Sequence, residues 1–190
     1  MERRFAVRAL RLGLAALVLG ALLAVAGCGG SSSSSSNESS ADDWASGLCS
    51  ALTTWTNSVK SAGDELKGNV SKDSLNTASD DIKSASDTLV SDLKDLGKPN
   101  TKQGQDAKNA MDQLSNEVKS DVTQMQSDVK NASGVQGAAT AASSVSTALS
   151  TMGNQINSAA SKLDAADPDG ELKKAFQNAS ACDSLTSSSS

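Results

Sequence analysis

Two short motifs place a serine three residues before a lysine, at Ser91–Lys94 and at Ser127–Lys130. In acyl-transfer chemistry a lysine at this spacing activates the serine hydroxyl as a nucleophile. That chemistry also needs donors for the oxyanion and the partner motifs Ser-Asp-Asn and Lys-Thr-Gly, and neither motif occurs in this sequence. Because serine and lysine are abundant in the chain, we expect both pairs to lie on solvated helix faces.

Other arrangements of reactive side chains are also excluded. The chain has no histidine, so Ser-His-Asp and Cys-His arrangements and zinc sites of the Cys/His type cannot form. Asp167-Pro-Asp-Gly-Glu171 has some likeness to a calcium loop, but aligning its glycine with position six places Ala165 and Phe176 at the two end positions. The segment predicts a turn and a helix N-cap. We expect no catalytic residue, no metal and no cofactor, and therefore not an enzyme.

The two tryptophans, Trp44 and Trp55, are eleven residues apart and return to nearly the same helix face. This spacing favours two side chains that anchor the core. The alternative is an aromatic binding platform, which requires both rings to be exposed.

Cys49 and Cys182 are an even pair once Cys28 is set aside. In an exported protein such a pair predicts a disulfide. The alternative is two buried free thiols.

The N-terminal segment has four arginines within Met1–Arg11 and then a wholly apolar or glycine run over Leu12–Ala26. This is the pattern of a secretory signal peptide, and the run is shorter than a membrane-spanning helix requires. It ends in Val25-Ala26-Gly27-Cys28, which resembles the lipobox of bacterial lipoproteins. The alternatives are an uncleaved anchor, or an ordinary signal peptide with an incidental cysteine.

The resemblance to bacterial lipoproteins covers Met1–Cys28 and implies that the Cys28 sulfur carries a diacylglycerol. It also implies that cleavage falls between Gly27 and Cys28, and that the new amine is often acylated. Two acyl chains hold a protein stably on a bilayer. The expected location is therefore the extracytoplasmic face of the cell membrane, with the lipid anchor as the membrane contact.

Composition divides the rest of the chain. Residues 28–41 combine the lipidated cysteine with a Gly/Ser-rich flexible linker, and 187–190 form a loose tail.

Removing the four arginines and one glutamate of residues 1–27 from the 17 basic and 22 acidic residues leaves 13 lysines and 21 acids. An acidic chain without arginine is a poor candidate for nucleic acid.

Residues 42–186 show four apolar stripes at helical spacing, over Trp44–Leu66, Leu75–Leu96, Ala107–Val129 and Ala138–Leu163. Breakers separate them at Gly68-Asn69, Gly97–Asn100 and Asn131–Gly137, and a short helix from Glu171 to about Ala181 follows. Short loops between long helices predict an all-α fold, an up-down-up-down four-helix bundle. The expected interior side chains include Leu52, Trp55, Ile82, Leu89, Leu114, Val118, Leu149 and Ile156.

These features favour a binding or accessory module at the cell envelope over an enzyme. An envelope protein or an apolar small molecule is the expected partner. The alternatives are a carrier that holds a small apolar ligand between helices, and a structural spacer or surface antigen. The Ala/Asp/Ser-rich composition resembles that of small lipoproteins of actinobacteria.

Overall fold

The computed structural model describes residues 38–68 and 70–183. The expected signal peptide (1–27), Cys28, most of the linker and the tail (187–190) lie outside these residues. The described residues all belong to one compact unit.

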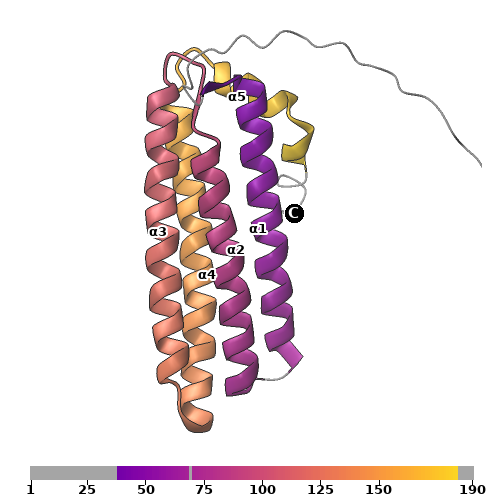
Figure 1. Ribbon diagram of the computed structural model, residues 1–190, viewed down its shortest axis with the longest axis vertical. Helices are drawn as coiled ribbons and strands as arrows, with labels where there is room; N and C mark the ends of the chain where they lie inside the picture. Colours follow the sequence, from indigo (N-terminus) through magenta and orange to yellow (C-terminus); the bar gives the residue numbers. More distant parts are fainter. Residues whose placement is uncertain (1–37, 69, 184–190) are drawn as a thin grey trace, which may run out of the picture. The chain divides into compact units, whose positions relative to one another are not determined.

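The described residues are mostly helical, which confirms the all-α prediction. Four long helices lie side by side (Figure 1): α1 (Ala41–Gly68), α2 (Lys72–Asp95), α3 (Gly104–Asn131) and α4 (Gly134–Ala165). A short helix α5 (Glu171–Asn178) and a 3₁₀ turn η1 (Ser180–Cys182) follow. Each long helix packs against the next one in the chain, and α5 and η1 pack mainly against α1.

The helix ends follow the predicted breakers. Ser71 caps α2 through a reciprocal capping box with Ser74. Gly97 follows α2 with a φ of 62°, in the left-handed region that glycine adopts at low cost.

The predicted break at Asn131–Gly137 was too long. In the structure α3 continues to Asn131 and α4 begins at Gly134, which has a φ of 65°. Val135 to Gly137 are therefore helical, because the extended residues Ala132 and Ser133, together with Gly134, already complete the turn. The last predicted helix is also divided, since α5 ends at Asn178 and η1 covers the residues up to Cys182.

A two-residue parallel pairing joins β1 (Glu38–Ser39) to β2 (Lys98–Pro99), which is part of the α2–α3 connection. The Ser40 hydroxyl then accepts a hydrogen bond from the backbone N–H of Asp43 and donates one to its carboxylate. Residues 38–41, which were predicted to belong to the flexible linker, are therefore part of the folded structure.

The interior agrees with most of the predicted core. Five of the eight expected side chains are buried: Trp55, Ile82, Leu89, Leu114 and Val118. Leu52, Leu149 and Ile156 are half-buried and pack against the core from its edge, so the prediction holds only in part for these three. The buried line of α4 runs instead through Ala138, Val145, Met152 and Ala159. Leu149 and Ile156 each lie four residues after a member of that line, on its flank.

Candidate functional site

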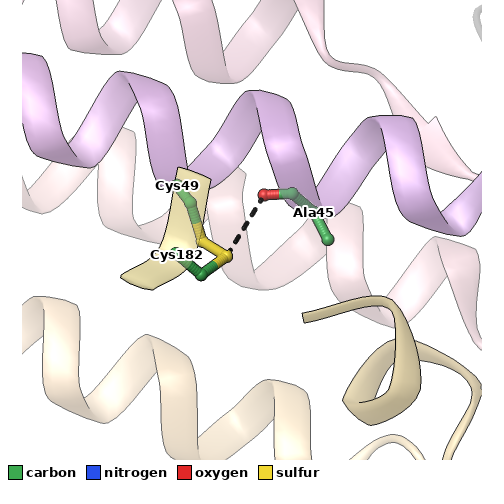
Figure 2. Close-up of a disulfide and its surroundings, with 3 residues drawn as sticks. All are labelled: Ala45, Cys49 and Cys182. Carbon is green, nitrogen blue, oxygen red and sulfur yellow. Dashed lines mark hydrogen bonds between the residues drawn. A yellow bond between two sulfur atoms is a disulfide. The ribbon is translucent and has the colours of Figure 1, made fainter. Parts of the chain in front are cut away.

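The structure contains the predicted disulfide between Cys49 of α1 and Cys182 of η1, with a sequence separation of 133 residues (Figure 2). The Cys182 sulfur lies 3.9 Å from the carbonyl oxygen of Ala45. Ala45 packs with Ala175 and Ala179 in a small apolar cluster between α1 and the C-terminal segment. The disulfide therefore fastens this segment to α1 and has a structural role.

Both tryptophans are buried, so they anchor the core as predicted and do not form an exposed platform. The Trp44 indole N–H donates to the Gly97 carbonyl at 3.3 Å, and its ring meets Phe176 edge-on at 6.1 Å. The Trp55 indole N–H donates to the Ser86 hydroxyl at 3.1 Å. This second bond fixes the register of α1 against α2.

The two Ser-x-x-Lys motifs lie on solvated faces, as expected. Ser91 and Lys94 are exposed on α2, and Ser127 and Lys130 are exposed on α3. A side-chain hydrogen bond with Lys94, and next to it the positive charge of Lys94, lower the pKa of Lys119 of α3.

Asp167 serves the turn and the cap that its motif predicts. Its backbone carbonyl accepts from the Gly170 N–H at 3.0 Å, which closes the turn. Its two carboxylate oxygens accept from the N–H groups of Glu171 and Lys173, each at 2.9 Å. Both oxygens are therefore occupied by the first turn of α5.

A groove of about 330 Å³ runs between α1 and α2. Its apolar floor consists of Ala51, Trp55, Ala62, Ala85 and Leu89. Its walls carry five hydroxyl side chains, from Thr54, Ser58, Ser61, Ser84 and Thr88. Three carboxylates, those of Glu65, Asp81 and Asp92, complete the lining. We call this feature the α1–α2 groove.

The carboxylates and two of the five hydroxyls of the α1–α2 groove can only accept hydrogen bonds, whereas Thr54, Ser61 and Ser84 keep a hydroxyl proton to donate. Ser58 and Thr88 each use the hydroxyl proton on a carbonyl of their own helix, those of Thr54 and Ser84, at 3.0 Å. Their remaining lone pairs, like carboxylate oxygens, accept only. Among the described residues, none of the three groove carboxylates forms an ion pair or a side-chain hydrogen bond, and no lysine belongs to the lining.

Sequence reasoning missed this groove, although a signal for it exists. Thr54, Ser58, Ser61 and Glu65 follow one another at steps of four, three and four residues, and Asp81, Ser84, Thr88 and Asp92 do so at steps of three, four and four. Each set forms a second helical stripe beside the apolar one. The neighbouring acids Asp80 and Asp81 point in different directions: Asp81 lines the groove, whereas Asp80 accepts from Gln126 of α3 at 3.5 Å.

Comparison with known proteins finds no matching family model, no similar curated protein and no similar solved structure. Within residues 38–68 and 70–183, no helix is sufficiently long and apolar to cross a membrane. In the same residues, no group of three or more acidic, histidine or cysteine side chains is arranged to hold a metal ion.

Proposed function

We propose that this protein is a lipid-anchored binding module on the extracytoplasmic face of a bacterial membrane, with its long helices in an up-down-up-down four-helix bundle. The observation that carries the binding role is the α1–α2 groove, whose carboxylates have no partner within the described chain. The anchor rests on Val25-Ala26-Gly27-Cys28 and the basic and apolar segments before it.

The bundle topology is supported by the connections and by the disulfide. The α1–α2 and α3–α4 connections are each only a few residues long, which favours antiparallel neighbours. With four such helices, the start of α1 and the end of α4 lie at the same end of the bundle. The bond between Cys49, early in α1, and Cys182, after α4, is consistent with that arrangement.

Replacing Cys28 with serine should release the protein from membranes or leave the precursor unprocessed, because a hydroxyl cannot take the place of the thiol as the site of lipid attachment. The measurement is membrane fractionation together with the intact mass of the chain. Gly30→Ser, a substitution within the same Gly/Ser stretch, serves as the matched control and should behave as wild type. If Cys28→Ser is found in the membrane fraction at the wild-type mass, the anchoring proposal is wrong.

A binding role predicts that the protein leaves its own membrane with something bound. Native mass spectrometry after extraction in a mild neutral detergent should show a mass above that of the lipidated chain, and the excess identifies a small molecule or a protein. A spectrum that shows only the mass of the lipidated chain would favour the structural spacer and contradict the binding role.

The carrier of an apolar ligand is a second candidate. It is favoured by Leu149 and Ile156 of α4, which are seven residues apart on one face of that helix and stay half-buried at the edge of the core. An apolar molecule lying on these side chains would cover the surface that they leave open to water. The same mass spectrum separates the two candidates, because a carrier would retain a lipid-like mass.

A further inference from the structure

From the lining of the α1–α2 groove we infer that its ligand is a linear polyamine, a chain of ammonium groups joined by short methylene segments. This inference deepens the proposed binding role and rests on it. It depends on three properties of the groove: the negative charge of its lining, the spacing of the charges and the apolar character of its floor.

The negative charge of the lining selects a cationic ligand that donates hydrogen bonds. Ser58 and Thr88 have already used their protons on carbonyl oxygens, and carboxylates accept only. An ammonium group has several N–H donors and no acceptor, so it leaves none of its own polar groups unpaired in such a site. An uncharged peptide segment has no positive charge to pair with the three carboxylates of this lining.

The spacing of the carboxylates selects an elongated cation. Asp81 and Asp92 lie on α2 and are separated by eleven residues, or about 16 Å along the helix at 1.5 Å per residue. That distance is too long for both to ligate one metal ion, for which ligand distances are about 2–2.6 Å. The bond between Trp55 and Ser86 sets the register of the walls, so Glu65 lies on α1 toward the Asp81 end. The groove therefore has negative charge at both ends.

The floor between these charges is apolar. Trp55 and Leu89 are almost fully buried, yet both border the groove with three alanines. Methylene segments can lie on such a floor while the ammonium groups reach the hydroxyls and carboxylates at its edges. A linear polyamine alternates these two kinds of group along one flexible chain.

The test is isothermal titration of the full lipidated chain in neutral detergent with spermine as the probe. We expect saturable binding that weakens as salt is raised, since the contacts are between exposed charges. Putrescine, a short diamine that cannot reach from Asp81 to Asp92, should bind at least several-fold more weakly. Asp92→Asn should weaken spermine binding about fivefold, the upper range for a solvated ion pair, and Asp81→Asn/Asp92→Asn more than tenfold.

Asp164→Asn is the matched control, because it makes the same change of charge at an exposed carboxylate of α4 outside the groove. Its spermine affinity should stay within twofold of wild type. If Asp164→Asn and Asp92→Asn lose equal spermine affinity, the binding depends only on the overall charge of the protein, and the inference is overturned. If tetralysine binds more tightly than spermine, and Asp81→Asn/Asp92→Asn weakens that binding, the ligand is a basic peptide and the inference is overturned. Absence of spermine binding would also overturn the inference. The proposed function is tested by other measurements, the fractionation of Cys28→Ser and the native mass spectrum, so its failure can be told apart from that of the inference.

Discussion

Replacing Leu114 with aspartate is expected to unfold the helical unit. Leu114 lies in the middle of α3 and is 2% exposed, within the single large apolar cluster that joins the four long helices. The substitution removes a buried aliphatic side chain and places an unpaired charge in the same space. Loss of the leucine alone costs about 2–5 kcal/mol, and the charge adds several more, against a total stability of about 5–15 kcal/mol for a typical domain.

Far-ultraviolet circular dichroism with urea titration measures this effect. Leu114→Met keeps the volume and polarity of the site, and it should cost less than about 1.5 kcal/mol. Lys119→Ala, at an exposed position on the same helix, should leave the midpoint unchanged or slightly raised, because it removes a positive charge close to Lys94. A wild-type urea unfolding curve for Leu114→Asp would show that this part of α3 does not face the core.

Breaking the Cys49–Cys182 bond is the second large effect. The bond closes a loop of more than 130 residues, so in the chain-entropy model it stabilises the fold by about 4–5 kcal/mol. At about 2–4 °C per kcal/mol for a unit near this size, the double variant Cys49→Ser/Cys182→Ser should melt about 10–15 °C lower. The C-terminal segment should loosen first, because α5 and η1 contact mainly α1.

Differential scanning calorimetry of oxidised, reduced and double-variant protein measures this loss. The reduced protein and the double variant should agree, since both lack the same crosslink. Ser50→Ala, at an exposed position next to Cys49, is the matched control and should melt as wild type does. An intact mass with two free thiols in the exported protein would contradict the bridge.

The helices and their ends were predictable because their signals are local. An apolar stripe at steps of three and four residues identifies the buried face of a helix from that helix alone. Ser71 and Gly97 mark ends because capping and positive φ depend on the residue itself. The cysteine pairing was predictable for another reason, since two thiols remained once Cys28 was set aside.

The tertiary structure decided which flank of each stripe is covered. Leu149 and Val145 are both apolar members of the α4 stripe, yet Val145 is buried and Leu149 is half-buried. The difference depends on which helices lie beside α4, and periodicity within α4 carries no information about its neighbours.

The α1–α2 groove also depends on tertiary structure. Its two walls are far apart along the chain, and the small side chains of Ala51 and Ala85 become a floor only when α1 and α2 pack together. The Trp55–Ser86 bond then sets which residues of one wall face which residues of the other. The sequence alone determined that these helices carry serine, threonine and acidic side chains beside an apolar stripe. Helix packing decided that these side chains face one another across a groove, because the distance between side chains on two helices depends on packing and not on spacing along either chain.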